Sequence, residues 1–271
     1  MTRHLLSVAD LDDTALRTVL DTAAEMHDVQ RREVKKIPTL RGRTVINLFF
    51  EDSTRTRSSF EIAGKWMSAD TINITGKGSS TSKGESLRDT VRTIAAMGVD
   101  AIVMRHQASG AAQQVARWFD ETGTPTSVVN AGDGRHEHPT QALLDLLSLR
   151  RAFGDVGGLT IAICGDIAHS RVARSNLILL GKMENRVRLV GPATLMPSGA
   201  AEWGCEIYED MAEGLRDADV VMMLRLQKER MDGGFIPSER EYFHRWGLDA
   251  AKLALAKPDA IVMHPGPMNR G

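Results

Sequence analysis

The sequence predicts an α/β fold with two doubly wound parallel-sheet domains. The first reason is that apolar strand segments and amphipathic helical segments alternate along the chain. The second is length, because 271 residues suffice for two domains of about 130 residues. The third is the segment TVINLFF at residues 44–50, whose nearly continuous apolar character is typical of a parallel strand covered on both faces.

The charge balance excludes some classes of function. Lys plus Arg total 34 and Asp plus Glu total 35, giving a net charge of -1, which argues against a nucleic-acid or anionic-membrane surface built on bulk charge. Any anion site must therefore be local. Cys164 and Cys205 have no metal-ligand spacing and form no disulfide framework, so a reducing cytoplasm is expected. The sequence has no apolar run of about 18 residues and no signal-peptide pattern.

The first half of the chain contains four expected strands. An opening helix is expected from Leu11 to about Gln30, where apolar residues recur at helical spacing after Asp12 or Asp13 as the cap. Strands are then expected at 44–50, 71–74, 101–104 and 127–129, and helices from Thr54 onward and at 85–97, 111–120 and 140–153.

The second half repeats the alternation, with strands expected near 160–164, 187–190, 220–224 and 260–263. The two series meet at NAGDGRHEHPTQ, which precedes a long amphipathic segment. This predicts a first domain at residues 1–137, a linking helix at 138–153 and a second domain at 154–271. Because ligands bind in clefts between such domains, the active site is expected there.

Polar side chains follow the strand at residues 44–50. Ser53, Thr54, Arg55 and Thr56 come where a helix N-terminus favours an anion. Their hydroxyls and backbone amides can hold phosphate oxygens, and arginine adds a planar fork of donors. The alternative is a capped surface helix with solvated arginines. Arg105 follows the strand AIVM and is either a solvent-exposed strand-end residue or a second cation at the same edge.

Two loops have weaker patterns. The loop GKGSSTSKGE at residues 76–85 is more often a flexible surface loop when taken alone, and it lacks the phosphate-binding pattern of NTPases. In GDGRHEHPTQ, the adjacent His136, Glu137 and His138 do not converge easily on one ion, so no metal is expected. His138 fits better as a hydrogen-bond donor to a substrate carbonyl.

The second half has three polar clusters of the same kind, each just past an expected strand. Arg171 stands at a helix entrance after TIAIC, Arg225 and Gln227 follow VVMML, and residues 264–267 (HPGP) follow AIVM. In a parallel sheet, side chains at these positions face the binding crevice.

Seven stretches in this order resemble the aspartate/ornithine carbamoyltransferase family along essentially the whole chain. They are FFEDSTRTRSSFE, KGESLRDT, MRHQASGAA, HPTQALLDL, GDIAHSRVARS, LRLQKER and HPGPMNRG. Glu51, the KGE loop, RLQKER and HPGP are similar to the aspartate enzymes of the family. The resemblance implies transfer of a carbamoyl group from carbamoyl phosphate to L-aspartate, in pyrimidine biosynthesis, with no cofactor.

The resemblance also assigns roles to residues. It implies that the first domain binds carbamoyl phosphate and the second binds aspartate. The carbamoyl phosphate ligands would be Ser53, Thr54, Arg55, Thr56, Arg105, His138, Gln141, Gly266 and Pro267, with Arg55, Thr56, Arg105 and His138 catalytic. The aspartate ligands would be Lys83, Arg171, Arg225 and Gln227.

Ser79 and Lys83 match positions that the family donates to a neighbouring subunit's site, which implies a homotrimer, with regulatory or dihydroorotase chains as further partners. Family members usually continue beyond HPGPMNRG into a C-terminal helix that returns to the first domain, and this sequence ends at Gly271. Two alternatives stay open: a carbamoyltransferase for another amine such as ornithine, and an impaired anion-binding subunit of a larger assembly.

Overall fold

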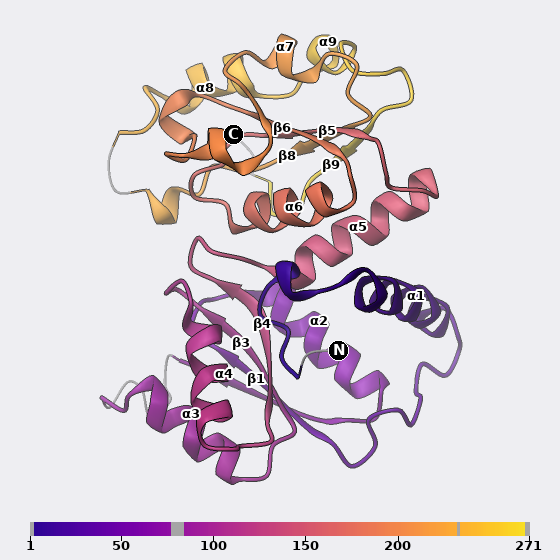
Figure 1. Ribbon diagram of the computed structural model, residues 1–271, viewed down its shortest axis with the longest axis vertical. Helices are drawn as coiled ribbons and strands as arrows, with labels where there is room; N and C mark the ends of the chain where they lie inside the picture. The colour runs from indigo at the N-terminus through magenta and orange to yellow at the C-terminus, as the bar shows by residue number, and fades with distance from the viewer. Residues whose placement is uncertain (1–2, 77–83, 232–233, 269–271) are drawn as a thin grey trace. The chain divides into compact units, whose positions relative to one another are not determined.

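The chain divides into a first unit at Met1–Thr140 and a second unit at Gln141–Gly271 (Figure 1). The structure, a computed structural model, describes residues 3–76, 84–231 and 234–268. Among these residues, no helix has both the length and the apolar character needed to cross a membrane.

The first unit is built on a four-stranded parallel sheet with strand order β2-β1-β3-β4. Its elements are η1 (Val8–Asp10), α1 (Asp13–Gln30), β1 (Thr44–Phe49), α2 (Thr54–Trp66), β2 (Asp70–Thr75), α3 (Leu87–Ala96), β3 (Ala101–His106), α4 (Ala111–Glu121) and β4 (Ser127–Asp133). The predicted elements of this half are thus confirmed to within a few residues. Asp12 is the cap of α1, accepting from Ala15 N at 2.7 Å.

Apolar cores on both faces of this sheet explain the continuous apolar run of β1. Ile46 and Leu48 pack with α3 and α4 on one face. Phe49 packs on the other face with Phe60 of α2. Because successive side chains of a strand point to opposite faces, a strand covered twice is apolar at nearly every position. The buried Asn47 is an exception, and its Nδ2 donates to Asn73 Oδ1 of the neighbouring strand β2 at 2.9 Å.

The second unit has a five-stranded parallel sheet with strand order β7-β6-β5-β8-β9. Its elements are α5 (Pro139–Phe153), which begins just before the unit boundary, β5 (Thr160–Cys164), α6 (Arg171–Lys182), β6 (Arg186–Val190), η3 (Ala193–Leu195), η4 (Ala200–Trp203), β7 (Glu206–Tyr208), α7 (Met211–Leu215), β8 (Val220–Met223), η5 (Lys228–Arg230), α8 (Glu239–Trp246), α9 (Ala250–Leu253) and β9 (Ile261–Met263). The sequence does not predict β7, because a three-residue edge strand is too short to show a period.

Both sheets reverse their winding direction between two neighbouring strands. In the first unit the chain leaves β1 toward β2 and then returns to β3 on the other side of β1. In the second unit the chain leaves β5 toward β6 and β7 and then returns to β8. Each reversal is a topological switch point, and the crevice at the carboxyl ends of its two strands is where open α/β sheets bind ligands.

Candidate active site

The N-terminus of α2 forms the first part of the candidate site. Ser53 is the N-cap residue with extended backbone, and its side chain makes no capping hydrogen bond. The first intrahelical bond runs from Arg57 N to Ser53 O at 3.1 Å, so the amides of residues 54–56 precede any intrahelical acceptor. Thr54 and Arg55 are exposed. Such a helix start presents N–H donors and the positive end of the dipole to an anion.

Arg105 lies at the same sheet edge, as the sequence predicts. It is paired in register with Phe49, the last residue of β1. Its Nη2 donates to Glu51 Oε1 at 3.1 Å and its Nη1 donates to Ala131 O at 3.2 Å, with the side chain 11% exposed. The Arg105 guanidinium is therefore fixed beside the turn that leads into α2, at the switch point of the first unit.

The loop after β4 is organised around the buried carboxylate of Asp133. This carboxylate accepts from Gly110 N at 2.6 Å and from Asn130 Nδ2 at 2.9 Å, and His136 Nδ1 lies 3.1 Å from it. Burial acts to raise the pKa of Asp133, but the hydrogen bonds from His136, Asn130 and Gly110 outweigh it and lower that pKa. The charged carboxylate therefore stabilises the loop.

The adjacent side chains of residues 136–138 (HEH) contact different partners. His136 contacts Asp133, and the buried Glu137 accepts from the Ser7 hydroxyl and from Val8 N at 3.2 Å. His138 is 6% exposed, with its Nδ1 at 3.4 Å from Thr140 Oγ1. His138 therefore stands just before α5, where the sequence predicts a substrate-contacting histidine.

The switch point of the second unit is organised around Asp166, which is fully buried. Its Oδ1 lies 2.7 Å from His169 Nδ1, and its Oδ2 accepts from Gln227 N at 3.0 Å. Asp166 thereby joins the loop after β5 to the loop after β8. The sequence analysis does not single out Asp166, although an aspartate placed directly after a buried strand and a glycine is a usable signal.

The predicted aspartate ligands lie on these two loops. Arg171 is the first residue of α6 and is 2% exposed, whereas Arg225 and Gln227 are half-buried just beyond β8. Arg225 Nη1 donates to Leu226 O at 3.2 Å. The structure thus brings the three residues to the carboxyl ends of adjacent strands.

The HPGP segment follows β9, the next strand of the same sheet. Gly266 N donates to His264 Nδ1 at 2.7 Å, and the peptide bond between Gly266 and Pro267 is cis. Gln141, near the start of α5, donates from its Nε2 to Asp145 Oδ1 at 2.9 Å. The predicted contributors Ser79 and Lys83 lie outside the described residues.

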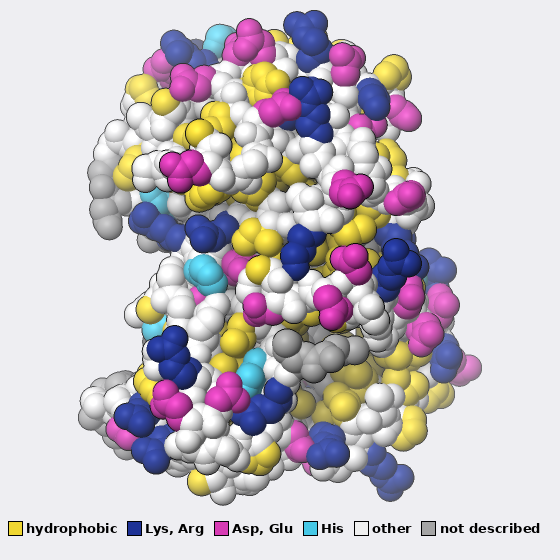
Figure 2. Space-filling view, in the orientation of Figure 1, with side chains coloured by type: hydrophobic (Ala, Val, Ile, Leu, Met, Phe, Trp, Pro, Cys, Tyr) yellow, Lys and Arg dark blue, Asp and Glu magenta, His cyan; other side chains and the backbone are white. Residues whose placement is uncertain are grey.

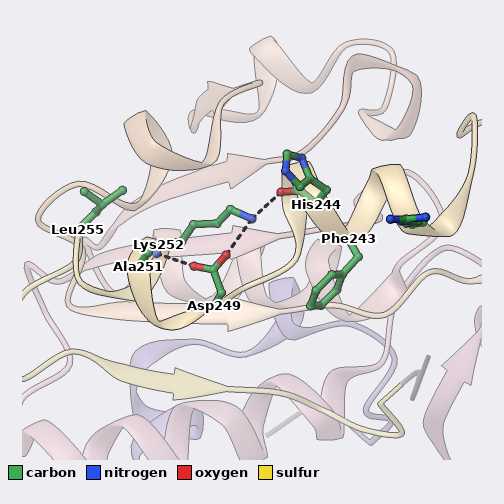
Figure 3. A pocket seen from close by; sticks show the side chains of 7 residues that line it. Phe243, His244, Asp249, Ala251, Lys252 and Leu255 are labelled. Atoms are coloured by element: carbon green, nitrogen blue, oxygen red, sulfur yellow. Dashed lines mark hydrogen bonds and ion pairs between the residues drawn. The ribbon is translucent and has the colours of Figure 1, made fainter.

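A surface pocket of about 600 Å³ in the second unit is lined by residues of α8, of α9 and of the segments beside them (Figure 3). Its Lys252 Nζ lies 3.5 Å from Asp249 Oδ2 and donates to His244 O at 2.9 Å. The pocket contains none of the predicted ligands. Figure 2 shows basic and acidic side chains interspersed over the visible face of each unit.

Comparisons with known proteins match both halves of the chain to one family. Residues 3–151 match the model described as aspartate/ornithine carbamoyltransferase, carbamoyl-P binding domain, and residues 157–271 match its Asp/Orn binding domain. An aspartate carbamoyltransferase catalytic subunit of Paracoccus denitrificans is 66% identical over 99% of this chain and 83% of that protein. That of Ruegeria pomeroyi is 61% identical over 99% of this chain and 85% of that protein.

Solved structures agree with these matches. Aspartate transcarbamoylase from Trypanosoma cruzi in complex with N-(phosphonacetyl)-L-aspartic acid has a TM-score of 0.85 and 34% identity, covering 98% of this chain and 85% of that chain. Ornithine carbamoyltransferase from Gloeobacter violaceus has a TM-score of 0.80 and 28% identity, covering 100% and 87%.

Proposed function

Because the chain belongs to the aspartate/ornithine carbamoyltransferase family, we propose that it transfers the carbamoyl group of carbamoyl phosphate to the amine of L-aspartate. The products are N-carbamoyl-L-aspartate and phosphate, in pyrimidine biosynthesis. The observation that carries this conclusion is the 66% identity with an aspartate carbamoyltransferase catalytic subunit along 99% of the chain. We also propose that the reaction uses no cofactor and that the protein is cytoplasmic.

The phosphate of carbamoyl phosphate binds at the N-terminus of α2. Ser53, Thr54 and Thr56 supply hydroxyls, and Arg55 and Arg105 supply charge. The amides of residues 54–56, which precede the first intrahelical bond from Arg57 N to Ser53 O, support this role. A unit charge pair at 4 Å contributes about 4 kcal/mol at an effective dielectric of 20, so each arginine can contribute substantially to anion binding.

The carbamoyl oxygen is polarised by Thr56, Arg105 and His138, which donate hydrogen bonds to it. This oxygen gains negative charge when the carbamoyl carbon becomes tetrahedral, so donors fixed in advance lower the barrier. The restraint of Arg105 by Glu51 and Ala131 supports such preorganisation. The carbamoyl NH₂ contacts Gln141 and the backbone at Gly266 and Pro267.

Aspartate binds through its two carboxylates to Arg171, Arg225 and Gln227, with Lys83 from a neighbouring subunit. Arginine suits this role because its planar fork matches a carboxylate. The hydrogen bond from Gln227 N to Asp166 supports the role of Gln227. This bond fixes the backbone of Gln227, so that the side chain can bind a carboxylate of aspartate. Two arginines favour a dicarboxylate acceptor over ornithine.

The chemical step needs no side-chain nucleophile. The deprotonated amine of aspartate attacks the carbamoyl carbon, a C–N bond forms, and the C–O bond to phosphate breaks as phosphate leaves with the bonding electrons. The amine loses one proton, for which the leaving phosphate is an acceptor. Catalysis is then mainly orientation of two reactants and stabilisation of the oxyanion.

The assembly proposed is a homotrimer that shares active sites through Ser79 and Lys83. Regulatory or dihydroorotase chains are further candidate partners. The molar mass in solution, measured by light scattering, tests the trimer. A monomeric protein with full activity would contradict shared sites.

The function is tested by measuring phosphate release from carbamoyl phosphate with aspartate, with ornithine and with neither. Aspartate-dependent release is expected, and a preference for ornithine would contradict the proposal. Arg55→Ala should lower kcat/KM for carbamoyl phosphate about ten- to hundredfold, because a charge-assisted contact is lost. Wild-type activity in that variant would refute the assigned phosphate role of Arg55.

A further inference from the structure

A buried carboxyl group links α5 and α6 of the second unit through hydrogen bonds. Both helices are labelled in Figure 1. Asp145 is 5% exposed. Its Oδ1 accepts from Gln141 Nε2 at 2.9 Å, one turn earlier on α5. Its Oδ2 accepts from Asn176 Nδ2 on α6 at 2.8 Å. Asn176, itself fully buried, also donates from Nδ2 to Val172 O at 3.1 Å. Both oxygens of Asp145 are therefore occupied by amide donors.

This arrangement decides which way the Gln141 amide faces. The oxygen and nitrogen ends of a glutamine amide have nearly the same shape, so shape alone does not orient it. An ionised carboxylate only accepts hydrogen bonds, and the end of Gln141 that faces Asp145 must therefore be its NH₂. The Oε1 of Gln141 then points away from Asp145 and is available to accept a hydrogen bond.

We infer that Asp145 is a positioning residue that holds the Gln141 side chain with its oxygen toward the NH₂ of the carbamoyl group. The inference rests on the proposed function, in which Gln141 contacts that NH₂. The carbamoyl NH₂ is a donor, so it binds the oxygen of an amide and is repelled by the nitrogen. A flipped Gln141 would place one donor against another at the reacting group.

The orientation depends on the charge of Asp145. A protonated Asp145 can donate from Oδ1 to the Oε1 of a flipped Gln141, while its Oδ2 still accepts from Asn176. Burial raises the pKa of Asp145 to about 6, against the hydrogen bonds from Asn176 and Gln141.

The charged residues of the two helices lie at other positions. Arg150 and Arg151 are in the last turn of α5. On α6, Arg171 and Arg174 are among the first four residues and Lys182 is the last residue. The Arg174 guanidinium stacks on Trp203 at 5.5 Å. The groups that act on the Asp145 carboxyl from α5 and α6 are thus the amides of Gln141 and Asn176.

The substitution Asp145→Asn imitates the protonated carboxyl at every pH. Its Oδ1 can keep the bond from Asn176, which leaves its NH₂ facing Gln141 and selects the flipped amide. At pH 8 and saturating aspartate, kcat/KM for carbamoyl phosphate should fall about thirty- to hundredfold. The ratio of wild-type to variant kcat/KM should decline toward one as the pH is lowered from 8 to 5, because titrations common to both proteins cancel in the ratio.

Testing Asp145→Asn in a Gln141→Ala variant separates the positioning of Gln141 from a general structural effect of the substitution. In Gln141→Ala the amide is gone, so adding Asp145→Asn should change kcat/KM by less than about twofold. The ratio of wild type to Gln141→Ala should show the same decline with pH, which keeps the test available if Asp145→Asn does not fold. Asp259→Asn is the matched control, since Asp259 is exposed, and its kcat/KM should equal that of wild type throughout.

The outcomes separate this inference from the proposed function. A wild-type protein that forms no N-carbamoyl-L-aspartate would overturn both. With an active wild type, the positioning role of Asp145 is overturned by a ratio independent of pH. It is equally overturned by an undiminished effect of Asp145→Asn in the Gln141→Ala background.

Discussion

Replacing Arg105 by alanine should reduce catalysis severely while leaving the fold intact. The guanidinium lies at the switch point of the first unit, is 11% exposed and is paired with Glu51 at 3.1 Å. In the proposed site Arg105 contacts the substrate phosphate, and loss of a charge at about 4 Å from that phosphate would remove about 4 kcal/mol at an effective dielectric of 20, which corresponds to about a thousandfold in rate. The Glu51 carboxylate that remains would repel the phosphate and add to the loss.

The expected cost of Arg105→Ala to stability is smaller. The side chain donates to Glu51 and to Ala131 O, and Glu51 is 25% exposed, so water can replace its partner. The free energy of unfolding should fall by about 1 to 3 kcal/mol.

The assay is kcat/KM for carbamoyl phosphate from phosphate release, with urea unfolding as the check on folding. Arg43→Ala is the matched control. Arg43 is also an ion-paired arginine, with Nη1 at 2.7 Å from Asp100, but it precedes the amino end of β1. The Arg43→Ala variant should have a kcat/KM within about twofold of that of wild type. A loss below tenfold in folded Arg105→Ala, or equal losses in the two variants, would refute the reasoning.

Three further predictions concern stability and assembly. Gly165 has φ +125° and an added Cβ would lie 2.7 Å from Leu224 O, so Gly165→Ala should lower the free energy of unfolding by about 3 kcal/mol. Gly158→Ala, with φ +74° and open space, should cost only about 1 kcal/mol, and equal losses would contradict the steric argument. Since burial raises the folded-state pKa of Asp145 from 3.8 to about 6, stability from the neutral carboxyl is complete below pH 3.8 and is lost as the pH rises through about 6. Asp145→Asn should therefore exceed wild type in unfolding free energy by about 2 to 3 kcal/mol at pH 8 and match it below pH 4, and a pH-independent difference in urea unfolding would count against this. Lys83→Gln and His138→Ala should each be nearly inactive alone but regain activity when co-refolded, and a mixture as inactive as its parents would argue against shared sites.

The strand ends could be predicted because their signals are local. A strand covered on both faces is apolar at nearly every position, and TVINLFF, with Asn47 as its one polar residue after Thr44, is such a run. The helix after it begins at Thr54 as predicted. Its start depends on the N-cap residue Ser53 and the residues that follow it, which are neighbours in the sequence. The edge shared by Ser53–Thr56 and Arg105 follows from parallel pairing, in which the carboxyl ends of all strands meet.

Other features depend on partners distant in the sequence. The edge strand β7 spans Glu206–Tyr208 and exists because β6 offers it a free edge. Asp166 is joined to Gln227, which lies 61 positions further along the chain. Glu137, which in sequence reads as part of a histidine cluster, instead accepts from Ser7 and Val8 near the N-terminus.

The sequence by itself determined the α/β class, the order of the elements, the family and the candidate ligands, because these follow from periodicity, strand-end position and the seven family stretches. Only the tertiary structure decided the winding order of the two sheets and the pairing of Asp145 with Gln141 and Asn176. The physical reason is that burial and hydrogen-bond partners set the charge of a carboxyl group and the direction of an amide, and both depend on which helices pack together.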